Sequence, residues 1–148
     1  MPAHPSFRPT LTDEERAAAR ALRLAIEPFY QMRPNVPLSY LRTFLLIAEE
    51  EGLGVADYAE QANIAPSVMT RNMLDIGERN RHKEEGMNLI VTERDPFDLR
   101  KHNTRVTPKG KGTVRQWVSA LKTFCSYVQR SPQARPGDDT QAAAPPPS

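Results

Sequence analysis

The residues of this chain that could carry metal or nucleophilic chemistry are few and scattered. The single cysteine, Cys125, has no second cysteine with which to form a disulfide or a zinc site, and we expect it to be buried as a small apolar side chain. The histidines, His4, His82 and His102, do not have the spacing of metal ligands. Glu49 to Glu51 are expected at a solvated helix end. Together with the lack of a Gly-rich phosphate loop or a nucleophile elbow, this predicts no enzyme, no metal and no other cofactor.

The net charge of +2 is unevenly distributed along the chain. Residues 38–65 hold one basic and five acidic side chains, whereas residues 66–115 hold eleven basic and seven acidic ones. Such asymmetry indicates that the second segment faces a polyanion. The longest apolar run, Phe44 to Ala48, is too short to span a bilayer, and the N-terminus lacks the pattern of a secretory signal. We therefore expect a cytoplasmic protein without membrane contact.

The two ends of the chain differ in composition from the rest. Residues 1–11 and 131–148 are rich in proline and polar residues, so we expect them to be disordered. Between them, Thr12 and Glu15 have the spacing of a capping box, which predicts a helix over residues 12–33. Pro28 is expected to kink or end this helix, because proline lacks the N–H and crowds the preceding turn.

Hydrophobic periodicity predicts three further helices, over about residues 39–50, 55–62 and 66–78. Asn63 stands at the turn between the last two, where the left-handed conformation is needed. Pro66 suits the first turn of the third of these helices. One face of that helix carries Met69, Met73 and Ile76, which we assign to the core.

The period then changes from that of a helix to that of a strand. Residues 87–93 and 102–106 read as two strands of a hairpin, and Thr107 followed by Pro108 begins a last helix over 108–130. The fold class is thus mostly α with a small β-hairpin wing, a winged helix-turn-helix over 38–107. The expected organisation places the two terminal helices, 12–33 and 108–130, on either side of this domain.

The terminal helices have broader apolar faces than a monomer needs. We therefore expect a homodimer built from both, with the last helix supplying a heptad-like seam. The dimerisation residues so predicted are Leu22, Ile26, Phe29, Val114, Trp117, Val118, Leu121, Phe124 and Val128.

Two motifs make the chain similar to the multiple-antibiotic-resistance regulator (MarR) family of bacteria. LGVADYAEQANIAPSVMTRNMLDI resembles the family's helix-turn-helix, and DPFDLRKHNTRVTPKGK resembles its wing, D-P-x-D-x-R followed by L-T-x-K-G. The positions in register are Leu53, Val55, Ala59, Ile64, Ser67, Met69, Thr70, Arg71, Met73, Ile76, Asp95, Pro96, Asp98, Arg100, Val106, Thr107, Lys109 and Gly110. The resemblance covers about residues 38–111.

The resemblance implies a transcriptional regulator that binds double-stranded DNA at a pseudo-palindromic operator in the nucleoid. The helix at 66–78 would enter the major groove, and the wing at 87–106 would reach the minor groove or the backbone. In the wing, Asp98 would orient Arg100 for the minor groove, a role weighed against a simple ion pair. The DNA-binding residues implied are Pro66, Ser67, Thr70, Arg71, Arg94, Asp98, Arg100, Lys101 and Arg105.

Three features depart from the family pattern. Ala65 replaces the usual Ser or Thr cap, residues 77–86 form a longer and more charged connection, and only one helix follows the wing where the family has two. Alternative interpretations are a winged-helix module for protein interaction, or a DNA-binding accessory factor of a plasmid or phage assembly. The resemblance also leaves room for a small-molecule effector as a further partner.

Overall fold

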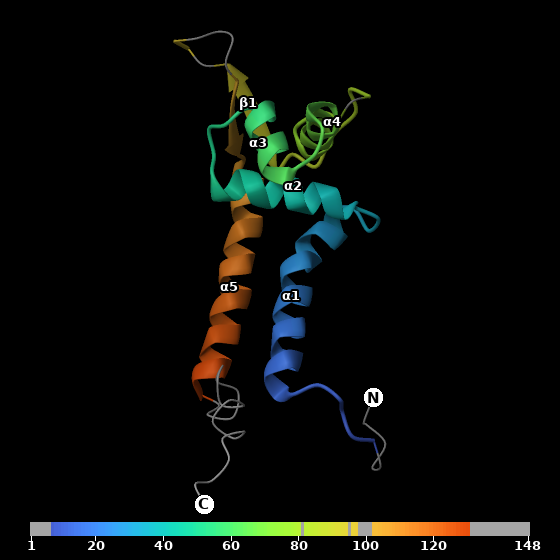
Figure 1. The fold of residues 1–148 in the computed structure, drawn as a ribbon, viewed down its shortest axis with the longest axis vertical. Helices are drawn as coiled ribbons and strands as arrows, with labels where there is room; N and C mark the ends of the chain where they lie inside the picture. The colour runs from blue at the N-terminus through green and yellow to red at the C-terminus, as the bar shows by residue number, and fades with distance from the viewer. Residues whose placement is uncertain (1–6, 81, 95, 98–101, 131–148) are drawn as a thin grey trace, which may run out of the picture. The chain divides into compact units, whose positions relative to one another are not determined.

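The computed structural model describes residues 7–80, 82–94, 96–97 and 102–130. Five helices and a two-stranded antiparallel sheet make up the regular structure of these residues (Figure 1). In chain order they are α1 (Asp13–Met32), α2 (Leu38–Glu49), α3 (Val55–Ala62), α4 (Pro66–Ile76), β1 (Ile90–Arg94), β2 (His102–Val106) and α5 (Pro108–Arg130). Among them, no helix has the length and apolar content that crossing a membrane requires.

The chain divides into two compact units, and α1 and α5 each run from one into the other. The smaller, the terminal-helix unit, contains residues 7–26 and 117–130 of the described chain. The larger, the wing unit, extends from Glu27 to Gln116. The fold class predicted from the sequence, mostly α with a hairpin wing, is confirmed.

The start of α1 follows the capping signal in the sequence. The Thr12 amide donates to Glu15 Oε2 at 2.7 Å, and the Glu15 amide donates to Thr12 Oγ1 at 3.1 Å, so both halves of the capping box form. The helix nevertheless continues through Pro28 to Met32, so Pro28 does not end it. Beyond the proline, the buried Phe29 ring packs at 5.6 Å from the Phe44 ring. Burial of that ring offsets the one helical hydrogen bond that proline removes.

The wing unit has one apolar core to which all of its elements contribute. Phe29 of α1 and Phe44 of α2 pack together in it, and the hairpin adds Ile90 and Val106. The large apolar and aromatic side chains less than 2% exposed are Phe29, Phe44, Ile47, Tyr58, Met69, Ile76, Leu89 and Ile90. The prediction that Met69, Met73 and Ile76 face the core is confirmed, since all three are buried.

The turn between α3 and α4 has the backbone that its residues favour. Asn63 adopts the left-handed conformation, with φ of 55°, as its position predicts. The Arg42 guanidinium donates to the carbonyl of Ala62 at 2.6 Å, which satisfies one of the free acceptors at the end of α3. No side chain caps α4, whose N-cap is Ala65, and Pro66 occupies its first turn as expected.

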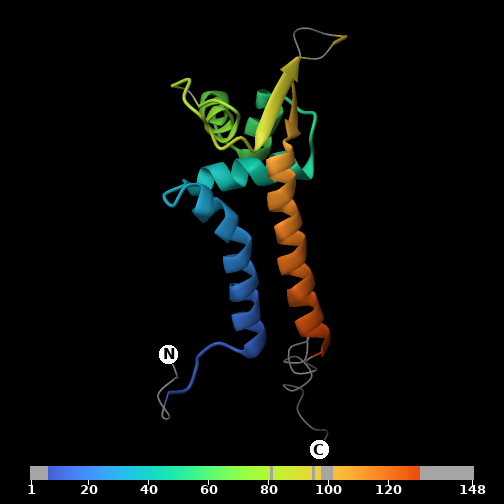
Figure 2. The same cartoon turned by 180° about the vertical axis from the view of Figure 1, so that it is seen from behind.

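The hairpin is shorter at its start than the sequence indicates. β1 begins at Ile90 rather than Met87, whereas β2 matches its predicted range, and Figure 2 shows the two strands side by side. Residues 87–89 instead form a strap, in which the amides of Met87, Asn88 and Leu89 donate to the carbonyls of Asp75, Gly77 and Ile76. The left-handed conformation of Asn88, with φ of 54°, turns the chain from this strap into β1.

The wing closes onto the first turn of α5. Thr107 donates its hydroxyl to the Asn88 carbonyl at 2.6 Å, and the same oxygen accepts the Gly110 amide at 3.0 Å. Thr107 is therefore the cap that the sequence predicts. A side chain at Gly110 would overlap the carbonyl oxygen of Leu89, so glycine allows helix and strap to touch.

In the terminal-helix unit, the first half of α1 packs beside the second half of α5. The Trp117 indole N–H donates to the carbonyl of Ala25 at 2.6 Å, and Ala21 and Ala120 are buried. Cys125 is exposed, not buried as expected. It follows Phe124 on α5, and the helical turn directs the smaller side chain away from α1 while Phe124 is the one half-buried.

Two glycines of α5 differ in their surroundings and so give opposite predictions. Gly110→Ala is expected to lower the free energy of unfolding by about 1–3 kcal/mol, because its methyl group meets the Leu89 carbonyl. Gly112→Ala has nothing within 4 Å and should raise it by up to about 1 kcal/mol through helix propensity. Urea denaturation of both variants measures the two changes. Equal changes would contradict close packing at Gly110.

Candidate nucleic-acid interface

Helix α4 separates its buried and exposed side chains along its whole length. Positions 69, 72, 73 and 76 are buried, whereas positions 67, 70, 71 and 74 are exposed. This is the spacing of opposite faces of one helix. The predicted contact residues Ser67, Thr70 and Arg71 therefore share one exposed face, and Pro66 is exposed at its start.

The polar side chains of that face differ in how many hydrogen-bonding groups they leave free for a ligand. Thr70 donates its hydroxyl to the carbonyl of Pro66 at 2.9 Å, which leaves its oxygen lone pairs as acceptors. Within the described residues, the side chains of Ser67 and Arg71 form no hydrogen bond. Arg71 thus presents all of its donors to solvent or to a ligand.

Two apolar residues of α4 are also exposed, and the sequence analysis did not single them out. Val68 is 40% exposed and Leu74 is 43% exposed. Leu74 lies seven residues after Ser67 and so belongs to the same face. The available signal was that both fall out of register with the core positions Met69, Met73 and Ile76. Apolar side chains on such a face can contact the methyl group of thymine.

The strand register places the basic residues of the wing on two faces. Arg94 pairs with His102, and Val91 pairs with Arg105. Because side chains alternate along a strand, Arg94 points to one side of the hairpin and Arg105 to the other. Both are exposed. Of the predicted wing contacts, Asp98, Arg100 and Lys101 lie outside the described residues.

The loop after α2 holds the base of the wing. The Val106 amide donates to Glu51 Oε2 at 2.9 Å, and the Gly52 amide donates to the Thr104 carbonyl at 2.8 Å. Glu51 is therefore not merely a solvated carboxylate, as its place in an acidic run suggested. It satisfies an edge amide of β2 that the hairpin itself leaves without a strand partner.

Tyr58 of α3 forms two hydrogen bonds with the backbone of this loop. Its buried hydroxyl donates to the Glu50 carbonyl at 2.7 Å and accepts the Leu53 amide at 3.3 Å. Burial raises the pKa of Tyr58, and the nearby carboxylates of Glu50, Glu51 and Asp57 add to the rise, while the Leu53 amide opposes it. The neutral phenol thus joins α3 to the loop that holds the wing.

The predicted dimerisation residues fall into three groups. Leu22, Ile26, Val118 and Leu121 of the terminal-helix unit are 44–65% exposed, and Trp117, Phe124 and Val128 of the same unit are half-buried. Val114 of the wing unit is half-buried. Phe29 is 1% exposed and packs on Phe44, so its inclusion was wrong, because its surface is already used inside the wing unit.

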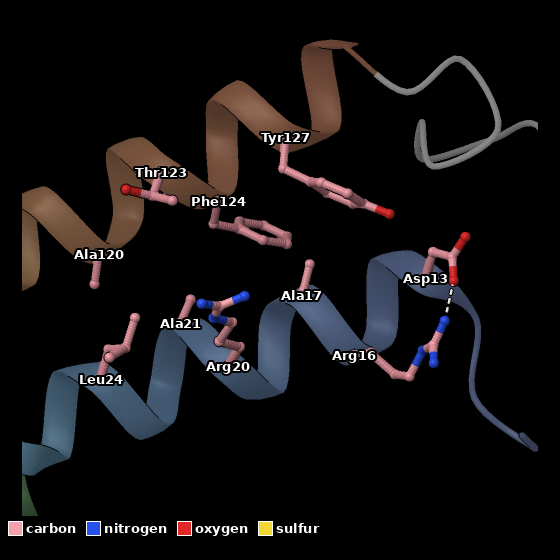
Figure 3. A pocket seen from close by; sticks show the side chains of 10 residues that line it. All are labelled: Asp13, Arg16, Ala17, Arg20, Ala21, Leu24, Ala120, Thr123, Phe124 and Tyr127. Carbon is pink, nitrogen blue, oxygen red and sulfur yellow. Dashed lines mark hydrogen bonds and ion pairs between the residues drawn. The ribbon is translucent and has the colours of Figure 1, made fainter. Parts of the chain in front are cut away.

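A groove runs between α1 and α5 in the terminal-helix unit (Figure 3). Its floor is apolar, with Ala17, Ala21 and Leu24 on α1 opposite Phe124 on α5. Arg16, paired with Asp13, lies near one end of the groove, where Tyr127 points toward α1. The groove adds to the apolar surface of this unit.

The sequence matches no protein-family model and no curated protein. Solved structures do match. RV1404 from Mycobacterium tuberculosis has a TM-score of 0.59 at 18% identity, covering 93% of this chain and 91% of that one. A MarR-like transcriptional regulator from Thermotoga maritima has a TM-score of 0.58 at 18% identity, covering 89% of both chains. A mutant of S. aureus MepR bound to an oligodeoxyribonucleotide has a TM-score of 0.57 at 15% identity, covering 86% and 85%.

These similarities show the fold. The chain has the architecture of MarR-like regulators along most of its length, so the resemblance read from the helix-turn-helix and wing motifs is confirmed at the level of structure.

The raised pKa of Tyr58 predicts how stability changes in alkali. Below about pH 10, tyrosine is neutral in both states, so its contribution is fully present. As the pH rises from there through the folded-state pKa, the unfolded chain ionises first and stability is lost. The free energy of unfolding of the native chain should therefore fall relative to that of Tyr58→Phe across this range. Urea titrations at several pH values measure the difference.

Tyr30→Phe, at an exposed position, is the matched control for the loss of one phenol. A constant difference between the native chain and Tyr58→Phe across the range in which tyrosine ionises would contradict the raised pKa.

Proposed function

We propose that this protein is a transcriptional regulator that binds double-stranded DNA in a sequence-specific manner, with α4 in the major groove. The observation that carries the proposal is the exposed face of α4, on which Ser67, Thr70, Arg71 and Leu74 stand together. Arginine reads guanine, hydroxyls bind phosphates and base edges, and apolar groups meet the thymine methyl. A MepR mutant of the same fold was solved with an oligodeoxyribonucleotide bound, which supports this choice of partner.

The wing would add contacts beside those of α4. Arg94 and Arg105 point to opposite sides of the hairpin, so one of them at a time can face the nearest phosphate row. The anchoring of Val106 by Glu51 would give these contacts a fixed base. Pro66 would contact the backbone at the start of α4. The wing tip, with Arg100 oriented by Asp98, would reach the minor groove or backbone.

The protein would act as a homodimer formed by its terminal-helix unit. The exposed Leu22, Ile26, Val118 and Leu121 and the groove between α1 and α5 supply the apolar surface for a second copy. A two-fold dimer presents two recognition helices, which matches a pseudo-palindromic site.

Selection of duplexes from a random pool tests the proposed function as a whole. We expect an enriched, two-fold symmetric sequence whose binding weakens with the logarithm of salt concentration. A protein-interaction module would enrich no sequence, and that outcome would reject the proposal.

Arg71 gives the sharpest single test of the recognition face. Arg71→Ala should weaken binding to the selected duplex by roughly 1–3 kcal/mol if the guanidinium contacts a base through two hydrogen bonds. Arg23→Ala, which removes the same charge from an exposed position of α1, is the matched control and should change affinity little. Fluorescence anisotropy with the selected and a scrambled duplex measures both. An equal loss on both duplexes would assign Arg71 to phosphate contact only.

The dimer prediction concerns Leu121, which is 55% exposed on α5. Sedimentation of the native chain should give twice the 16.7 kDa chain mass. Leu121→Glu should shift the protein toward the monomer, because a carboxylate cannot be buried unpaired in an apolar interface. Ser119→Glu, an exposed position on another face of the same helix, should leave the mass unchanged. A native chain that sediments as a monomer at every concentration would exclude the dimer.

A further inference from the structure

Two hydrogen-bonded pairs of polar side chains are buried between α2 and α4. The Tyr40 hydroxyl donates to Asp75 Oδ2, and Asn72 Nδ2 donates to Thr43 Oγ1 at 3.3 Å. All four residues are between 2% and 7% exposed. We call these contacts the two polar rungs.

The surroundings of the rungs would suit apolar side chains. Phe44, Ile47, Met69 and Met73 are buried on the same two helices. Buried polar side chains cost free energy of desolvation that their hydrogen bonds only partly return, so an apolar pair of the same shape would be as stable or more so. The rungs therefore need an explanation other than stability.

The spacing of the rungs along the two helices provides such an explanation. Tyr40 and Thr43 lie three residues apart on α2, and Asn72 and Asp75 lie three residues apart on α4, in the opposite order. Both bonds form only in one register. A shift of α4 by one residue turns its faces by about 100°, which breaks both rungs and moves Arg71 off the exposed face. Flexible methionines such as Met69 and Met73 adapt to many helix rotations and impose no such restriction.

We propose that the two polar rungs fix the rotation of α4 about its axis, so that Tyr40 and Thr43 are positioning residues for DNA sequence readout that touch no DNA. The inference rests on the proposed function for its consequence, since rotation decides which side chains reach the bases. The rotation itself is a property of the free protein. Asp75 adds a second restraint, because its carbonyl accepts the Met87 amide of the strap at 3.2 Å.

The test replaces the Thr43–Asn72 rung with apolar side chains of the same size. In the full chain, Thr43→Val with Asn72→Leu should keep cooperative unfolding and a midpoint close to that of the native protein. The ratio of affinities for the duplex selected by the native chain and for its scrambled counterpart should fall by about tenfold, as if one base pair were no longer read. Binding to the scrambled duplex at low salt should persist.

A packing control separates positioning from stability. Ile47→Val removes one methylene group from the same interface without touching a rung, so it should lower stability and leave the affinity ratio unchanged. A second variant, Tyr40→Phe, deletes one oxygen atom and should lower the affinity ratio by about threefold. On a free-energy scale this is half of the tenfold change expected for the double variant. Tyr40→Phe keeps the test decisive if the double variant does not fold.

The rotation of α4 can be tested in the free protein, without DNA. Amide NMR spectra of the free proteins should show broadened or doubled signals for α4 in the rung variants, with α5 signals unchanged, because exchange between rotations occurs on the microsecond to millisecond scale. Sharp, single α4 signals and a native affinity ratio in both rung variants would overturn the proposal. If the native chain selects no sequence, the proposed function fails, and the spectra alone decide whether the rungs fix the helix.

Discussion

The strap of residues 87–89 is the constraint on which the rest of the wing unit depends. On one side its three amides bind the last two carbonyls of α4 and the carbonyl of its C-cap, Gly77, and on the other the Leu89 carbonyl accepts the Thr107 amide at 3.0 Å. These carbonyls have no partner within their own helix, so the strap completes α4 in the way that a C-cap would. Because these three residues lead directly into β1, the strap joins the end of α4 to the base of the wing.

Two carboxylates of the wing unit are bound inside the protein, whereas several of its guanidinium groups are exposed. Glu51 and Asp75 are occupied by hydrogen bonds inside the protein, to the Val106 amide and the Tyr40 hydroxyl. Exposed guanidinium groups such as Arg71 and Arg105 have no such internal use among the described residues. The segment that holds α4 and the wing is therefore more basic at its surface than its residue count indicates, since the buried Asp75 carboxylate contributes less to the external field.

Local signals in the sequence predicted most elements, and long-range contacts decided the remainder. The capping box at Thr12, the turn at Asn63 and the cap at Thr107 each depend on residues a few positions apart, and each is present. The continuation of α1 past Pro28 depends instead on Phe44, fifteen residues beyond Phe29. The late start of β1 depends on the carbonyls of α4, which compete for the amides of the strap. Hydrophobic periodicity describes one element at a time, so it does not show which residue of another element a side chain or amide will meet.

The same reasoning applies to the candidate site. Helical spacing and a motif predicted the exposed face of α4, because the exposure of a residue on a helix does not depend on one distant partner. The hydrogen bonds of Glu51 and of the polar rungs were not predicted, because the partner residues, Val106, Asp75 and Asn72, are 29 to 55 residues away in the sequence. A buried polar side chain cannot be recognised from its type alone, since its role is set by the group that it meets.

Two helices form the covalent path between the two units. Only α1 and α5 continue from the terminal-helix unit into the wing unit. In the wing unit, α1 carries Phe29, which packs on Phe44 of α2, and α5 carries Gly110, which touches the strap. Within the wing unit, Phe44 thus lies on the helix that carries Tyr40 and Thr43, and Gly110 lies against the strap that binds the end of α4. Asp75 takes part in both arrangements, because its side chain belongs to a rung and its carbonyl binds the strap.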